Sequence, residues 1–268
     1  MSASGVDWLA LCRRAAGRVK GALAGFSGAA ERGVETGRGE GGDTALVIDR
    51  AAEDAILSEL EALGEPLTVV SEERRELALA GGGSTHVVVD PIDGSLNAKR
   101  GLPFASLSIA VAEGARMADV GFGYVAGLGA EGEWWAERGS GARRDGEPLP
   151  ALEPGPLEVL ALETARPALV AEAAPAIGEL EARRIRALGS VALSLCLVAD
   201  GSLDAMASLR AVRSVDAAAG QLIAREAGAA LAFPEAGDLA APLRLAMRSR
   251  VLAARDRALL ERLRATLG

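Results

Sequence analysis

Two carboxylates directly follow an apolar segment in this sequence. Residues 87–95 read VVVDPIDGS, with Asp90 and Asp93 beyond the valines. The valines predict a strand, and the end of a strand can hold polar side chains in fixed positions. Because the proline favours an extended chain at Asp90 and Gly94 permits a tight turn, the two carboxylates can converge on one point. With the Ile92 carbonyl as a third oxygen ligand, they would suit Mg²⁺ or Mn²⁺.

A capped turn explains the same residues without any chemistry. Aspartate next to proline or glycine is common in turns, and Asp90 could cap a helix that begins near Asp93. An EF-hand calcium loop does not fit, because Ile92 stands where that loop needs a ligand. The segment alone therefore leaves a metal site and a capped turn equally open.

Two distant segments add further carboxylates. Glu72 and Glu73 directly follow an apolar strand pattern, and Asp216 lies at the expected start of a helix at 215–227. Each has a simpler interpretation, since charged residues commonly end a strand in solvent and aspartate commonly caps a helix. Taken together with the first segment, however, they favour a metal site.

These segments together resemble the inositol monophosphatase family of metal-dependent phosphatases. The resemblance rests on DPIDGS at 90–95, SEE at 71–73, VDAAAG at 215–220, and the spaced Asp43 and Asp49. Further matches, in the family's order over nearly the whole chain, are GLPFA at 101–105, GSGA at 139–142 and RALGSVA at 186–192. The sequence looks closest to the archaeal-type branch, whose members often hydrolyse both inositol monophosphate and fructose 1,6-bisphosphate.

The resemblance implies a cluster of two or three Mg²⁺ ions, for which Mn²⁺ could substitute. The implied ligands are Glu73, Asp90, the Ile92 carbonyl, Asp93 and Asp216. Asp49 would orient the Ser95 hydroxyl, and this pair with Glu73 would position and deprotonate the attacking water. Carboxylates gathered in one cleft repel one another unless cations are present, so a divalent metal suits such a set. The Gly-rich stretch at 33–42 departs from the family's loop, which in relatives helps to hold a third ion.

Substrate groups are also implied by the resemblance. The implied contacts are Asp93, Gly94, Ser95, Gly189, Ser190, Val191, Arg210 and Arg213. Backbone N–H groups at the starts of two helices, near residues 94–95 and 189–191, would bind phosphate or hydroxyls. Leu209 stands where inositol-selective relatives tend to present a carboxylate, so the two arginines favour a second anionic group on the substrate. Solvated strand ends explain both arginines equally well.

These features predict a Mg²⁺-dependent phosphate monoester hydrolase similar to inositol-1-monophosphatase. It would act on a small sugar or cyclitol phosphate through attack of metal-activated water. One alternative is a fructose-1,6-bisphosphatase, or a nucleotide-directed phosphatase acting on NADP or 3′-phosphoadenosine 5′-phosphate, on the same scaffold. Another is a catalytically silent binding relative. The resemblance further implies lithium inhibition and a homodimer.

The composition disfavours several other classes of protein. The 268 residues carry a formal net charge of −8 and only 3% aromatic residues, which argues against nucleic-acid binding. Two cysteines and one histidine rule out a disulfide framework, a cysteine zinc cluster and a multi-histidine metal site. The longest apolar run, near 191–199, is too short to span a bilayer. We expect a soluble, unprocessed cytoplasmic protein with no nucleic-acid or membrane partner.

Residue periodicity predicts two halves. In residues 1–150 we expect helices at 7–26 and 49–63 over a mainly antiparallel sheet. Prolines at 148–156 suggest a boundary, and residues 151–268 alternate strands and helices as an α/β half. The first half would carry most metal ligands, and the second Asp216 and substrate-binding groups. The predicted fold class is α/β (α+β), as the layered αβαβα sugar-phosphatase fold that the resemblance implies.

Overall fold

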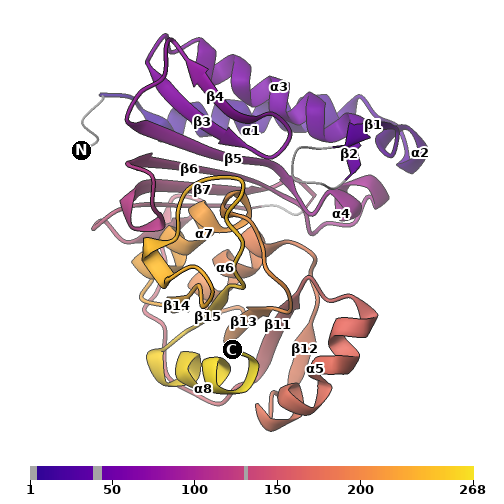
Figure 1. The fold of residues 1–268 in the computed structure, drawn as a ribbon, viewed down its shortest axis with the longest axis vertical. Coiled ribbons are helices and arrows are strands. Elements are labelled where there is room, and N and C mark those ends of the chain that lie inside the picture. The colour runs from indigo at the N-terminus through magenta and orange to yellow at the C-terminus, as the bar shows by residue number, and fades with distance from the viewer. Residues whose placement is uncertain (1–4, 39–43, 130–131) are drawn as a thin grey trace.

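Helices and sheets alternate in layers along the long axis of the molecule (Figure 1). The computed structural model describes residues 5–38, 44–129 and 132–268. An eight-stranded sheet carries helices on both faces, and a five-stranded sheet packs beneath the inner helices and is covered by further helices outside. This mixed α/β architecture confirms the predicted αβαβα layering.

The eight-stranded sheet is antiparallel except at one pair of strands. Its order is β10-β9-β8-β7-β6-β5-β3-β4, and only β3 and β5 run parallel among its described neighbours. The strands are β3 (Leu67–Ser71), β4 (Arg75–Leu79), β5 (Thr85–Asp93), β6 (Ser106–Glu113), β7 (Val120–Gly127), β8 (Glu133–Glu137), β9 (Ala142–Arg144) and β10 (Glu147–Pro148). Because helices cover both faces, β6 and β7 are buried along nearly their whole length.

Two amphipathic helices cover the outer face of this sheet. α1 (Trp8–Ala24) begins after Asp7, whose carboxylate accepts the N–H of Ala10 at 2.9 Å. α3 (Val47–Glu61) packs along α1, and together they bury one apolar cluster against the valines of β3 and β5. Burial of this cluster holds the start of α3, and with it Asp49, above the edge where β5 ends.

Residues 28–42 are rich in glycine, glutamate and arginine, a composition that predicts a loop, yet their described part contains regular structure. It includes α2 (Ala29–Arg32) and β1 (Glu35–Arg38), which pairs antiparallel with β2 (Thr44–Leu46). A periodicity analysis misses α2 and β1 because each has only four residues, and α2 buries none of them. A short helix, α4 (Ser95–Arg100), follows β5.

The five-stranded sheet combines parallel and antiparallel neighbours. Its order is β12-β11-β13-β15-β14, with β11 parallel to both β12 and β13. The strands are β11 (Val159–Glu163), β12 (Arg184–Arg186), β13 (Ala205–Ser208), β14 (Ala230–Ala232) and β15 (Leu252–Ala254). On its outer side lie α5 (Pro167–Glu179) and α8 (Arg257–Leu267), which share an apolar cluster with the sheet.

The layer between the sheets is formed by α6 (Val191–Ala199) and α7 (Ser214–Glu226), which pack against each other. One apolar cluster runs from the inner face of the first sheet through both helices to the second sheet. α7 lies very close to β7, because a Cβ atom on Gly123 would come within 2.8 Å of the Ala219 carbonyl oxygen. This close contact fixes the height of α7, and therefore of Asp216, above the first sheet.

The strands of the two sheets do not interleave along the chain, since the last strand of the first ends at Pro148 and the first strand of the second begins at Val159. α6 and α7 nevertheless share one core with the first sheet. The division into residues 1–150 and 151–268 as domains stays a prediction. Within the described residues, no helix combines the length and the apolar character that crossing a membrane requires.

Candidate active site

Three carboxylates from separate parts of the chain meet where β5 ends. Glu72 follows β3, Asp90 lies in β5 and Asp216 lies in the first turn of α7. Each offers an oxygen within 4.8 Å of the oxygens of the other two. In the parallel register Ser71 pairs with Val89, so the residues that follow them lie side by side. α7 packs against β5 and β7 and so brings Asp216 to the same place.

Glu72, and not Glu73, belongs to this acidic cluster. Glu72 directly follows β3, whose Ser71 pairs with Val89, so it lies beside Asp90, whereas Glu73 is one residue further into the turn and is not among the converging carboxylates. Glu72 is therefore a further candidate ligand that the sequence analysis did not name, while the role of Glu73 as a metal ligand stays a prediction. Glu73 is 6% exposed, and burial raises its pKa to about 7, with further contributions from the charges of Glu72 and Asp49.

Asp93 connects the end of β5 to the middle layer. Its Oδ2 accepts the Ser190 hydroxyl at 2.7 Å and the N–H of Ala192 at 2.6 Å. Burial, followed by the charge of Asp216, raises the pKa of Asp93 well above its usual range. The carboxylate therefore lies between the start of α6 and the acidic cluster, as a ligand at this position would.

The turn after Asp93 depends on Gly94, which has a φ of +94°. A Cβ atom there would lie 2.8 Å from the Phe104 carbonyl oxygen and 3.0 Å from that of Gly189. The absence of a side chain lets the chain turn tightly into α4 against two other segments. The Ser95 hydroxyl then donates to the Ile92 carbonyl oxygen at 3.0 Å.

Asp49 lies close to Ser95, the residue with which the family resemblance pairs it. Burial raises the pKa of Asp49, while hydrogen bonds with the Leu46 N–H and the Ser95 hydroxyl lower it. The Leu46 N–H donates to Asp49 Oδ2 at 3.0 Å. The geometry is compatible with a role for Asp49 in orienting Ser95, which stays a prediction. Asp43 lies outside the described residues.

Burial dominates the electrostatics of the cluster. It raises the pKa of Glu72 to about 7, an effect that the charge of Arg213 opposes and that of Asp216 reinforces. Burial also raises the pKa of Asp90, and Glu72 and Asp93 raise it further. Gathering these carboxylates as anions is therefore unfavourable without positive charge nearby.

Arg213 supplies positive charge inside the cluster. Its Nη2 lies 2.6 Å from Glu72 Oε1 and 3.2 Å from Asp216 Oδ1. Its backbone N–H donates to Asp216 Oδ2 at 2.7 Å. Sequence reasoning assigned Arg213 to the substrate, whereas the structure engages it with two carboxylates of the cluster.

The backbone N–H groups predicted at the start of α6 have a protein partner. The Gly189 N–H donates to Glu163 Oε2 at 2.8 Å, and that of Leu188 to Glu163 Oε1 at 3.2 Å. Ser190 contributes its hydroxyl to Asp93 and accepts the Leu193 N–H at 3.2 Å. In this structure Glu163 accepts the Gly189 N–H, so a substrate contact through that donor would require Glu163 to release it; the contact stays a prediction. For Val191, in the first turn of α6, substrate contact stays a prediction.

Two residues that shape this region were not singled out from the sequence. Glu163, only 1% exposed, also accepts the Ser194 hydroxyl at 2.7 Å, so it fixes the loop before α6. The Asn97 side-chain amide donates at 2.7 Å to the carbonyls of both Phe104 and Leu188. A carboxylate that ends the buried strand β11 is the only sequence signal that could have indicated Glu163.

Arg210 is exposed at the rim of the second sheet. Its backbone N–H donates to the Thr164 hydroxyl at 3.0 Å, just beyond the end of β11. The neighbouring Leu209 is partly buried against the apolar cluster of α5 and α8. Arg210 therefore stays a candidate for contact with the substrate.

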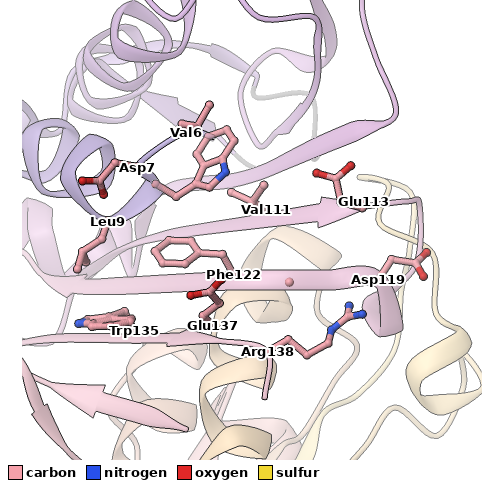
Figure 2. A pocket seen from close by; sticks show the side chains of 12 residues that line it. Val6, Asp7, Leu9, Val111, Glu113, Asp119, Phe122, Trp135, Glu137 and Arg138 are labelled. Atoms are coloured by element: carbon pink, nitrogen blue, oxygen red, sulfur yellow. The ribbon is translucent and has the colours of Figure 1, made fainter. Parts of the chain in front are cut away.

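A cavity of about 430 Å³ lies on the other face of the first sheet, beside the start of α1. Figure 2 shows Phe122 and Trp135 on its floor and the charged groups of Glu113, Asp119 and Arg138 toward one end. None of the residues that line it belongs to the acidic cluster. This cavity therefore lies apart from the acidic cluster.

Comparisons with known proteins agree with the site and the fold. A model of the inositol monophosphatase family matches residues 9–268. The fructose-1,6-bisphosphatase/inositol-1-monophosphatase of Methanothermobacter thermautotrophicus is 33% identical, over 97% of this chain and 96% of its own. The protein of that name from Archaeoglobus fulgidus is 36% identical, over 83% of this chain and 82% of its own.

A solved structure described as an inositol monophosphatase-fructose 1,6 bisphosphatase superposes with a TM-score of 0.83. It is 25% identical in sequence, and the match covers 98% of this chain and 100% of the other. Both the family match and the relatives extend across the acidic cluster and the two sheets that hold it. This chain belongs to the inositol monophosphatase family and is a phosphatase.

Proposed function

We propose that this phosphatase hydrolyses the phosphate monoester of a small sugar or cyclitol, similar to inositol 1-phosphate, and that it uses Mg²⁺ at the acidic cluster. The observation that carries the proposal is the convergence of Glu72, Asp90 and Asp216 within 4.8 Å of one another. Oxygen ligands of this kind match the preference of Mg²⁺ and Mn²⁺.

The residues present fit a divalent cation. Burial raises the pKa values of Glu72, Asp90 and Asp93, so these carboxylates favour a cation as their counter-charge. The proposed ligands are Glu72, Asp90, the Ile92 carbonyl, Asp93 and Asp216. A divalent cation bound there supplies charge that makes water more acidic and offsets the charge of the transferring phosphoryl group.

Three side chains are proposed to handle the attacking water. In the working state Asp49 would accept the Ser95 hydroxyl proton in place of the Ile92 carbonyl, which accepts it at 3.0 Å in this structure. The Ser95 oxygen would then be free to accept a hydrogen bond from water, and the Ile92 carbonyl would be free for the metal. Glu73 is the proposed proton acceptor, because a pKa of about 7 suits proton transfer near neutral pH. The role of Glu73 as a base is independent of whether it also binds the metal.

The phosphate is proposed to bind at the turn that opens α4. The N–H groups of Gly94 and Ser95 lie at this helix start, where backbone donors have no partner within the helix. Asp93 would support the same turn through its contacts with α6.

Fructose 1,6-bisphosphate is the second candidate substrate. Arg210 is exposed beyond the end of β11 and could bind a second phosphate with its planar guanidinium. Leu209 next to it offers no carboxylate for the hydroxyls of a cyclitol. The relatives from two archaea carry both activities in their names.

The test is phosphate release from inositol 1-phosphate, fructose 1,6-bisphosphate, NADP and 3′-phosphoadenosine 5′-phosphate, with and without Mg²⁺. Asp93→Asn serves as the blank, because it removes a proposed ligand while keeping the shape of the side chain. We expect Mg²⁺-dependent turnover that the variant loses, with one of the two sugar or cyclitol substrates preferred. Preference for a nucleotide would replace the substrate proposal, and turnover that persists in EDTA would refute metal dependence.

We also propose that the protein is a cytoplasmic homodimer without a nucleic-acid or membrane partner. Size-exclusion chromatography with light scattering tests the dimer, and a monomeric mass at micromolar concentration would contradict it. A catalytically silent relative is the outcome that remains if a folded, Mn²⁺-binding protein releases phosphate from none of the substrates.

A further inference from the structure

Arg213 occupies an unusual position for a residue expected to bind substrate. Its guanidinium reaches into the carboxylate cluster, 2.6 Å from Glu72 Oε1 and 3.2 Å from Asp216 Oδ1. Its backbone N–H takes the remaining oxygen, Asp216 Oδ2, at 2.7 Å. Arg213 therefore engages both oxygens of Asp216 and one oxygen of Glu72.

These contacts are shielded from solvent. The exposed fraction of the side chain is 14% for Arg213 and Glu72 and 12% for Asp216. Solvent screens such a pair far less than a surface ion pair, so its charges act strongly on any third charge nearby. The carboxylate of Asp90 lies within the same field, since its charge raises the pKa of Arg213 and that of Arg213 lowers the pKa of Asp90.

A guanidinium and a divalent cation compete for such oxygens in two ways. A lone pair that accepts an N–H from Arg213 is not available to a metal ion. In addition, a fixed positive charge a few ångströms away repels a cation that approaches the same carboxylates. The long arginine side chain can move away by rotating about its own bonds, while the backbone contact to Asp216 remains.

We propose that Arg213 is an internal counter-cation of the acidic cluster, which stabilises it and competes with the divalent metal for Glu72 and Asp216. This inference rests on the proposed metal-dependent function. It makes Arg213 a determinant of metal affinity, in addition to any contact with a substrate phosphate. The charge that stabilises the metal-free cluster thus also raises the metal concentration that is needed to occupy it.

The test is Arg213→Gln, measured by titration calorimetry with Mn²⁺ as the probe on EDTA-treated, dialysed protein. We expect Mn²⁺ to bind about tenfold more tightly or better, because the competing charge is gone. Arg213→Lys keeps the positive charge but lacks the planar guanidinium, so its Mn²⁺ affinity should lie between those of the wild type and Arg213→Gln. Arg184→Gln is the matched control, since it removes the same charge from the exposed strand β12.

A thermal melt supplies the second readout. In EDTA, Arg213→Gln should have a lower melting temperature than the wild type, because the carboxylates lose their cationic partner. Added Mn²⁺ should raise the melting temperature of the variant by more than it raises that of the wild type. A merely structural role for Arg213 would lower the first melt without tightening Mn²⁺ binding, which would overturn the inference. Mn²⁺ affinity that is unchanged or weaker in Arg213→Gln would overturn it as well. Absence of Mn²⁺ and Mg²⁺ binding in the wild type would instead refute the proposed metal-dependent function, and this inference with it.

Discussion

Replacing Glu73 by glutamine is the sharpest test of how the two neighbouring glutamates differ. Glu73 is 6% exposed, and its Oε2 is buried without a hydrogen-bond partner among the described residues. Burial, together with the charges of Glu72 and Asp49, raises its pKa from 4.5 to about 7. The folded protein therefore holds a proton at Glu73 more tightly than the unfolded chain does.

This difference makes the stability of the EDTA-treated protein depend on pH. Because the pKa of Glu73 is higher in the folded state, the contribution of Glu73 to the free energy of unfolding is greatest below about pH 4.5 and declines as the pH rises to about 7. At 1.36 kcal/mol per pKa unit, the loss attributable to Glu73 is at most about 3 kcal/mol. Glutamine cannot ionise, so Glu73→Gln should lack this loss.

The assay is urea unfolding of both proteins in EDTA between about pH 4.5 and pH 8. We expect the variant to be more stable than the wild type at pH 8, by up to about 3 kcal/mol, and similar to it at pH 4.5. Glu76→Gln, on the exposed part of β4, is the control for loss of one carboxylate. A stability difference that is the same at both ends of the pH range would refute the reasoning, because buried ionisation would then not be its cause.

The same pair of glutamates also tests the assignment of the metal ligand. Glu72→Gln should weaken Mn²⁺ binding strongly, whereas Glu73→Gln should leave most of it, because only Glu72 lies with Asp90 and Asp216. The reverse result would identify Glu73 as the ligand.

Three further substitutions examine the supports of the site. Gly123→Ala should lower the free energy of unfolding by about 1–3 kcal/mol in urea titrations, because its Cβ would come within 2.8 Å of the backbone of α7; Gly121→Ala, with nothing closer than 4.0 Å, should be neutral. Asn97→Ala should cost about 1–3 kcal/mol in the same assay, since two carbonyls lose their donor, and an unchanged midpoint would mean that water replaces the amide. Glu163→Gln should lower the free energy of unfolding by about 2 kcal/mol, because its side-chain NH₂ group would face backbone N–H donors. Hydrogen exchange at the Gly189 amide should become faster, and protection of that amide equal to the wild type would contradict this role.

The layers of the fold could be predicted from the hydrophobic periodicity of the sequence. The helix that we expect at 7–26 is α1, and the apolar strand pattern before Glu72 is β3, Leu67–Ser71. The elements that we did not predict carry weak patterns. β4 begins with two exposed charged residues and buries none of its residues fully, and α5 buries only Ile177 and contains Pro175. Local composition cannot indicate structure whose stability comes from a neighbouring element.

The residues of the acidic cluster were predicted from motifs, but the choice between adjacent glutamates was not. Which of two consecutive side chains faces Asp90 depends on the register of β3 against β5, and one residue of slip would exchange them. The role of Arg213 depends on how α7 docks against the first sheet. Both properties arise from tertiary packing, which no short motif encodes.

The electrostatic surroundings of Glu73 and Arg213 give changes at these two residues opposite effects. Glu72 has the Arg213 guanidinium at 2.6 Å, whereas burial and other carboxylates act on Glu73 with only the weaker opposition of Arg50. Removing the charge of Glu73 should therefore stabilise the protein in EDTA at neutral pH, while removing that of Arg213 should destabilise it. Arg213 offsets the repulsion between the buried carboxylates. Removing a negative charge from the cluster should therefore stabilise the protein, and removing the positive charge of Arg213 should destabilise it.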